Sequence, residues 1–211
     1  MKIPKGFHQI TVEQYQQALP VYQKAIEETD PLTSLGHWAV VIAIFTDSQL
    51  DDIEKMDIDK LKSIIKKLSW MGTKSFSNRK KHLFYLNGKL YKAPKEAKEF
   101  NTSRYVEYMT FYGRNGVIPE LHNLLATIYQ PYFKSDQTHE QRANEFKKAM
   151  IGDVYGTVFF YTKVYKNLMS HIQDCGLRVQ AEKLKELDIH LMETLKLILE
   201  DIGDGTLQST R

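Results

Sequence analysis

The spacing of apolar residues predicts a mainly α-helical chain, beginning near the N-terminus. Thr11 and Gln14 have the spacing of a capping box, which opens a first helix. Apolar residues then recur every three or four positions, as one helix face requires: Val12, Tyr15, Leu19, Tyr22 and Ile26. Pro20 lies inside this seam, and because proline has no amide hydrogen we expect the helix to kink there or to break into two pieces.

Further helices are expected before residue 70. Residues 32–45 are apolar nearly all round, which is typical of a helix buried by its neighbours. Ser48 then offers an N-cap, and Asp59 caps another amphipathic helix. The apolar face of that helix has the i, i+3, i+4, i+7 pattern: Leu61, Ile64, Ile65 and Leu68.

The C-terminal half is also expected to be helical. One helix lies around residues 103–112, and a second is opened by Pro119 and closed before Pro131. Thr138 and Gln141 form a second capping box, and Asp153 caps a long aromatic helix running toward Gly176. A leucine-rich last helix follows, with its face formed by Leu184, Leu187, Leu191, Leu195 and Ile198.

Between residues 83 and 92 the apolar residues no longer have helical spacing, and this segment predicts one β-hairpin. Two short apolar runs flank Asn87 and Gly88, a pair that readily takes positive φ in a type I′ turn. An isolated hairpin is marginally stable, so it must pack on the helices or gain strands from another chain. The predicted fold is therefore mainly α, a bundle of about seven to eight helices with one short β-hairpin near residues 83–92. Its two parts, 1–100 and 101–211, are expected to meet between residues 91 and 101 and to pack as one unit.

Composition agrees with a folded globular protein. Of the 211 residues, 42% are hydrophobic and 26% are charged. The longest uncharged apolar run, residues 35–45, is shorter than the roughly 20 residues that a membrane-spanning helix needs. We therefore expect no membrane association. Cys175 is the only cysteine, so no internal disulfide can form, and we expect a buried, unreactive thiol.

Charge is segregated along the chain. Residues 27–59 contain nine acidic residues against one lysine, whereas residues 60–99 contain twelve basic residues against two glutamates. Neighbouring blocks of opposite sign can neutralise each other within one fold or between subunits.

No catalytic or cofactor motif is present. The chain has no GxxxxGK[ST] loop, no GxGxxG or GxSxG sequence and no HExxH pair. His139 and Glu140 have no second histidine one turn further on, so a zinc site is not expected. The sequence thus predicts a protein that is not an enzyme and that uses neither a metal nor a cofactor.

The basic block and the hairpin carry the candidate partner-binding residues. Lysines interleaved with aromatic residues can grip phosphates and stack bases, so nucleic acid is an open alternative. We favour a protein partner, because lysine greatly outnumbers arginine and the acidic block adjoins the basic one. The candidate residues are Lys62, Lys66, Arg79, Lys80, Lys81, Tyr85, Asn87, Gly88 and Tyr91.

Five short segments, taken in order, resemble the small tail-assembly chaperones and related morphogenesis proteins of tailed bacteriophages. These segments are residues 10–15, 51–56, 84–91, 104–109 and 124–131, within a region of similarity that covers about residues 10–165. The shared pattern is a helical N-terminal part, an "nGk.Y" hairpin, a helix reading "t..qyie" and an "iLA.iy.P" helix.

This resemblance implies a non-enzymatic protein that binds other phage proteins. One role is a transient chaperone for the tail tape-measure protein, acting in the host cytoplasm during assembly. The other is a resident structural subunit in the neck, tail or baseplate ring of the virion. The long C-terminal helix exceeds what is typical of the shorter chaperones, so both roles stay open. In either role we expect the chain to form homo-oligomers, with its acidic and basic blocks orienting the subunits.

Overall fold

The architecture comes from a computed structural model that describes residues 1–73, 80–96, 99–167 and 170. The chain divides into two compact units, Met1–Thr162 and Lys163–Arg211. The hairpin pairs with residues that follow it in the chain, so residues on both sides of the expected joint between residues 91 and 101 belong to the first unit.

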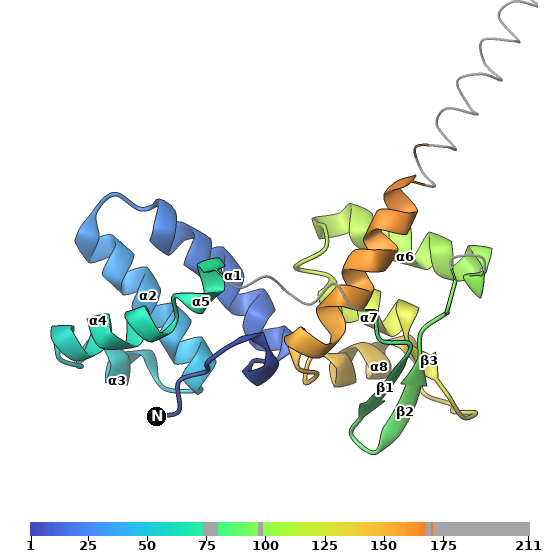
Figure 1. Cartoon of the computed structure of the whole chain (residues 1–211), viewed down its shortest axis with the longest axis horizontal. Coiled ribbons are helices and arrows are strands. Elements are labelled where there is room, and N and C mark those ends of the chain that lie inside the picture. Colours follow the sequence, from blue (N-terminus) through green and yellow to red (C-terminus); the bar gives the residue numbers. More distant parts are fainter. Residues whose placement is uncertain (74–79, 97–98, 168–169, 171–211) are drawn as a thin grey trace, which may run out of the picture. The chain divides into compact units, whose positions relative to one another are not determined.

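Helices make up most of the first unit (Figure 1). They are α1 (Val12–Glu27), α2 (Pro31–Thr46), α3 (Leu50–Glu54), α4 (Ile58–Lys67), α5 (Trp70–Thr73), α6 (Thr102–Asn115), α7 (Leu121–Ile128) and α8 (His139–Phe146). A 3-10 helix, η1 (Phe7–Gln9), precedes α1, and residues 151–162 are also helical. The strands β1 (Leu83–Leu86), β2 (Lys89–Lys92) and β3 (Gln130–Pro131) form one antiparallel sheet in that order. The predicted fold, mainly α with a short hairpin, is confirmed.

Helix α1 has the expected start but passes through Pro20 without breaking. The Thr11 hydroxyl accepts from the amide of Gln14, and the Gln14 side chain accepts from the amide of Thr11. Pro20 lies on the exposed side, where water can hydrate the carbonyl group that its missing amide leaves unpaired. Of the two outcomes expected at Pro20, a kink or a break, the break does not occur.

The buried faces of α1 and α2 differ from those that the sequence pattern predicted. The buried residues of α1 are Val12, Tyr15, Ala18 and Ala25, whereas Ile26 is 57% exposed. In α2 the buried residues are Ala39, Val41, Ile42 and Phe45, and Leu32 is 76% exposed. The two helices pack on each other, and small alanines allow the close approach. Helix α2 is thus exposed in its first turn, whereas residues 37–46 are all buried or partly buried.

Acidic side chains cap two helices in the acidic block. Asp30 accepts from the amide of Thr33 at the start of α2, and Asp57 accepts from the amides of Asp59 and Lys60 at the start of α4. The expected cap Asp59 was wrong by two positions, since its own amide is the group that is capped. Ser48 does not cap α3 either, because Gln49 occupies that position and makes no side-chain cap bond.

Short backbone contacts join the first helices to the end of the unit. Thr11 forms a β-bridge with Met150, and the amide of Val12 donates to the carbonyl of Ala149 at 2.8 Å. Gly152 lies so close to η1 that a Cβ atom there would come within 2.9 Å of the amide nitrogen of His8. These contacts require the N-terminal segment to lie against the start of the 151–162 helix.

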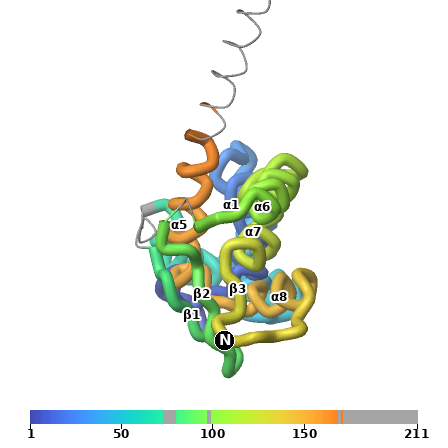
Figure 2. The backbone as a smooth tube through the Cα atoms, turned by 90° about the vertical axis from the view of Figure 1, so that its right-hand side faces the viewer, coloured from blue at the N-terminus to red at the C-terminus, as the bar shows by residue number. Residues whose placement is uncertain are grey.

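Helix α7 is the centre of the C-terminal part of the unit. It lies between α6 and α8 in both views (Figures 1 and 2), and it contacts both helices. Its buried residues match the sequence prediction at Leu121, Leu124, Leu125 and Ile128. Because α7 runs directly into β3, the helix fixes where the third strand joins the hairpin.

Candidate binding surface on the three-stranded sheet

The hairpin turn has the geometry that its sequence predicts. Asn87 has φ 49° and Gly88 has φ 78°, the left-handed conformations of a type I′ turn. The turn pairs Leu86 with Lys89, and this register sets which side chains share a face of the sheet.

One face of the sheet is buried. Phe84 and Tyr91 stand opposite each other in the register and both pack on Phe146 of α8, with ring centroids 6.2 and 5.1 Å away. Tyr129 stacks on the same ring at 5.5 Å, and its hydroxyl donates to the carbonyl of Lys81 at 2.7 Å. This aromatic cluster anchors the sheet to the helices.

The other face is exposed and apolar. Leu83 stands opposite Lys92, whose ammonium group lies 5.6 Å from the ring centroid of Tyr132, so these side chains share this face. Tyr85 alternates with buried Phe84 and is 68% exposed. Phe133 is 71% exposed, and its ring meets that of Tyr132 edge-on at 5.1 Å. We call this group the sheet surface: Leu83, Tyr85, Lys92, Tyr132 and Phe133.

The two edges of the sheet differ. By strand alternation, Leu83 and Tyr85 turn their backbone groups away from β2, and among the described residues these groups have no backbone partner. At the other edge, Tyr132 donates to the carbonyl of Leu90, so the backbone of Pro131 turns outward. Proline has no amide hydrogen to give a further strand. Edge β1 can therefore accept a strand, and edge β3 is poorly suited to do so.

Tyr91, expected at the binding surface, supports the sheet from inside. Its ring is fully buried, and its hydroxyl donates to Glu145 at 2.5 Å. Burial, with the Glu145 bond, raises the pKa of Tyr91 to about 12. Lys89 also pairs with Glu145, with 2.5 Å between Nζ and Oε1. Burial by itself would raise the pKa of the Glu145 carboxyl, but the hydrogen bonds from Lys89 and Tyr91 lower it. A partner on the sheet surface does not reach this ring.

The expected basic residues occupy different places. The ammonium group of Lys81 pairs with Asp153 at 2.5 Å, and that of Lys80 lies 4.3 Å from the ring centroid of Phe160 and donates to the carbonyl of Lys95. Asp153 lies inside the helix and binds a lysine, so the prediction that it caps the helix was wrong. The acid partners of Lys81 and Lys89 lie outside the acidic block.

The remaining expected residues divide into three groups. Lys62 and Lys66 are exposed on α4, which packs against α2 and contributes nothing to the sheet. Asn87 and Gly88 are exposed at the hairpin turn beside Tyr85. Arg79, Cys175 and the predicted last helix lie outside the described residues.

Sequence reasoning missed four of the five residues of the sheet surface, namely Leu83, Lys92, Tyr132 and Phe133. Strand β3 has only two residues, which is too short to show the period of two that indicates a strand. The aromatic pair that follows Pro131 was the available signal.

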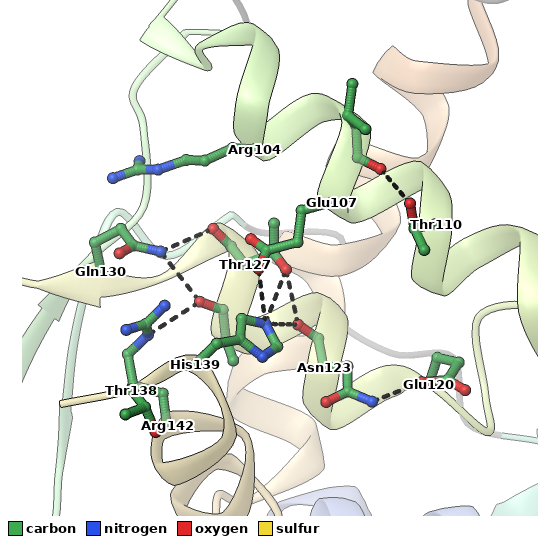
Figure 3. A network of polar contacts seen from close by, with 12 residues as sticks. Arg104, Glu107, Thr110, Glu120, Asn123, Thr127, Gln130, Thr138, His139 and Arg142 are labelled. Carbon is green, nitrogen blue, oxygen red and sulfur yellow. Dashed lines mark hydrogen bonds and ion pairs between the residues drawn. The ribbon is translucent and has the colours of Figure 1, made fainter.

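A polar network around His139 joins α6, α7 and α8 (Figure 3). His139 Nε2 lies 3.1 Å from the hydroxyl of Thr127, 3.3 Å from the carbonyl of Asn123 and 3.8 Å from Glu107. Thr127 already donates to the carbonyl of Asn123, so all three neighbours of Nε2 are acceptors and this nitrogen carries the hydrogen. The ring also stacks on Phe111 at 5.0 Å.

This network is a structural centre and not a catalytic triad. A triad needs its carboxylate on one ring nitrogen and its hydroxyl on the other, whereas Glu107 and Thr127 meet the same nitrogen of His139. Thr127 is also fully buried, out of reach of a substrate. Within the described residues, no three acidic, histidine or cysteine side chains gather as a metal site would require.

Comparisons of the chain with protein-family models, with curated proteins and with solved structures give no match. In the part of the chain that the structure describes, no helix has the length and apolar character needed to span a membrane.

Proposed function

We propose that this chain is a non-enzymatic phage assembly protein that binds other phage proteins, acting as a tail assembly chaperone. The observation that supports a binding role is the sheet surface, an exposed aromatic face beside an open strand edge. The phage context rests on the resemblance of residues 10–165 to the tail-assembly chaperones.

The chemistry of the sheet surface suits a protein partner. Tyrosine and phenylalanine rings bury large apolar areas with few rotatable bonds, which is why aromatic residues are enriched in protein interfaces. The β1 edge adds main-chain donors and acceptors for an extended segment. A chaperone with these features covers apolar segments of an immature partner and so prevents their self-association.

Co-expression with the tail tape-measure protein tests this proposal. We expect the chain to raise the soluble fraction of that protein, and the variants Tyr85→Lys and Phe133→Lys to remove most of the effect. Leu32→Lys is the matched control, since Leu32 is equally exposed but lies on α2, outside the sheet surface. An unchanged soluble fraction with the wild-type chain, or an equal loss in all three variants, would contradict the proposal.

A resident structural subunit of the neck, tail or baseplate ring is the alternative. Mass spectrometry of purified particles and of infected lysate separates the two roles. A chaperone is abundant in the lysate and absent from particles, whereas a resident subunit is found in the particles at a fixed copy number.

Nucleic-acid binding is a further candidate, because Lys92 lies over the ring of Tyr132 on the sheet surface. Aromatic rings with adjacent cations can hold single strands through stacking and phosphate contacts. Measured affinity for single-stranded DNA that falls steeply with salt would favour this function, and flat or undetectable affinity would remove it.

A further inference from the structure

The side-chain amide of Gln16 joins helix α1 to the start of α7. Its nitrogen, Nε2, lies 2.8 Å from the carbonyl oxygen of Ile118, 2.6 Å from that of Pro119 and 3.0 Å from Nδ1 of His122. These groups lie 102 to 106 positions after Gln16 in the chain. The amide therefore connects the N-terminal helices to the C-terminal part of the first unit.

The two carbonyl groups fix the orientation of this amide. A carbonyl oxygen can only accept a hydrogen bond, so an atom within 2.8 Å of two of them must be a donor. The amide nitrogen of Gln16 is a donor with two hydrogens, whereas the amide oxygen in the same place would face two acceptors. The amide therefore cannot turn over without losing both of these hydrogen bonds.

The same geometry fixes the hydrogen on His122. An amide nitrogen does not accept hydrogen bonds, so Nδ1 at 3.0 Å from it carries no hydrogen, and the neutral ring has its hydrogen on Nε2. A protonated ring carries a hydrogen on both nitrogens and would point one of them at the amide donor. Protonation of His122 is therefore incompatible with the present contacts of Gln16.

Charged and titratable groups from several elements surround the His122 ring. Glu13 lies in the first turn of α1, Glu120 precedes α7, Lys147 follows α8 and His139 begins α8. The two acids favour the charged ring, while Lys147 and His139 disfavour it. Burial has the largest influence, and it lowers the pKa of His122. The neutral ring is therefore the state favoured at neutral pH.

The start of α1 is held by bonds that do not titrate. The amide of Val12 donates to the carbonyl of Ala149 at 2.8 Å, and the amide of Glu13 donates to the carbonyl of Lys147 at 3.0 Å. Backbone groups keep their donor and acceptor roles across the pH range in which a histidine changes its charge. The side-chain amide contacts are therefore the part of this junction that a histidine can control.

We propose that Gln16 and His122 form a pH-sensitive link between α1 and residues 116–120, the segment that joins α6 to α7. While the ring is neutral, the amide holds two carbonyl groups of that segment. When the ring gains a proton at Nδ1, its new hydrogen displaces the amide, and the segment separates from α1. The link does not depend on the proposed function.

NMR titration of the full chain tests the contact between the two side chains. The ring signal that is lost in His122→Gln identifies His122. We expect Gln16→Glu to raise the proton affinity of this ring roughly tenfold or more, because a nearby carboxylate favours the charged form. Gln17→Glu is the matched control, since Gln17 is the exposed neighbour on α1, and it should leave the titration nearly unchanged.

Hydrogen exchange measures the opening of the link. Protection of residues 116–122, corrected for the intrinsic effect of pH, is compared at about pH 8 and about pH 5.5, on either side of the ordinary histidine range. We expect the wild-type chain to lose protection there at the lower pH, and His122→Gln to abolish this difference. His139→Gln should retain it, and thermal melting at the higher pH shows whether each variant folds.

Three results would overturn the proposal. The first is equal protection of the wild-type segment at both pH values. The second is a pH difference that persists in His122→Gln and disappears in His139→Gln, which would place the control at the other histidine. The third is an equal rise in proton affinity in Gln16→Glu and Gln17→Glu.

Discussion

Individual buried polar residues of this protein are held by specific hydrogen bonds. Glu120 is 8% exposed, and its two carboxylate oxygens accept from Asn115 at 2.9 Å and from Asn123 at 2.6 Å. Burial alone would raise the pKa of this carboxyl, but the two amide donors, with His122 and Arg114 nearby, lower it. The charged form is therefore favoured in the folded state.

Replacing Glu120 with Gln should lower the free energy of unfolding by about 1–3 kcal/mol at neutral pH, because glutamine offers one acceptor oxygen to two donors. A carboxyl whose folded pKa is depressed contributes stability above its unfolded pKa and loses that contribution as pH falls through the folded pKa. The difference between wild type and variant should thus shrink below about pH 4. Urea denaturation at pH 7 and at low pH measures this, and a constant difference would contradict it.

His139 also makes stability depend on pH, but through a buried base whose charged form is disfavoured in the folded state. Burial lowers its pKa, and Arg142 acts in the same direction, while Glu107 and the carbonyl of Asn123 oppose the shift. The unfolded chain therefore binds a proton more readily than the folded one, and stability falls as pH drops from about 7 through the lowered pKa. We expect His139→Gln to reduce this loss, measured as melting temperature between pH 8 and pH 5. His122→Gln should reduce the loss of stability in the same way, since burial lowers the pKa of His122 too.

Capping residues show what sequence can specify at the scale of one side chain. Thr11 and Thr138 were predicted with the correct partners, because a capping box lies within four residues. Asp59 was chosen over Asp57 since both acids lie two positions apart in front of the same helix, and only the backbone path decides between them.

At the scale of elements, two helical glycines differ in whether the surrounding atoms leave room for a side chain. Gly152 lies in the first turn of the 151–162 helix, against η1, where a Cβ would meet backbone atoms of His8 and Phe7 at 2.9 and 3.0 Å. Gly113 is exposed in α6, with nothing within 4 Å of a Cβ built there. The same substitution should therefore have opposite effects at the two positions.

We expect Gly152→Ala to destabilise the protein by about 1–3 kcal/mol, because backbone atoms cannot move aside cheaply. Gly113→Ala should stabilise it by about 0.5–1 kcal/mol, because alanine restricts the unfolded chain and favours the helix. Chemical denaturation of both variants measures the pair, and equal signs would show that the contact of Gly152 with η1 does not control stability.

Elements were predictable where their signals are local. The hairpin turn at Asn87 and Gly88 and the buried face of α7 follow from a few adjacent residues. The buried residues of α2 were not predictable, since nearly every side of that helix is apolar and its packing against α1, α3 and α4 decides which residues are covered. Strand β3 was not predictable either, because it forms where the end of α7 places Gln130 and Pro131 beside β2.

At the scale of the whole molecule, only some lysines of the basic block 60–99 pair with acidic residues of the same chain. Lys81 and Lys89 pair with acids outside the block 27–59, while Lys62 and Lys66 remain exposed on α4. Surface charges of opposite sign on different copies attract each other over about 10 Å at 0.1 M salt.

We therefore expect the chain to form homo-oligomers that dissociate as salt rises from 50 to 500 mM, measured by light scattering. A charge-reversing change at the two exposed lysines, Lys62→Glu with Lys66→Glu, should weaken these oligomers at low salt. A monomer at every salt concentration would contradict the expectation.

The outward-facing Pro131 also sets a limit on stoichiometry. Because the outward side of β3 has no amide hydrogen to donate at Pro131, β1 is the better edge for a guest strand in the described sheet, which then takes up one such guest. If the guest is β1 of another copy, the two sheets join about a twofold axis and growth stops at a pair. Growth of the described sheet beyond this pair, strand by strand, is thereby disfavoured.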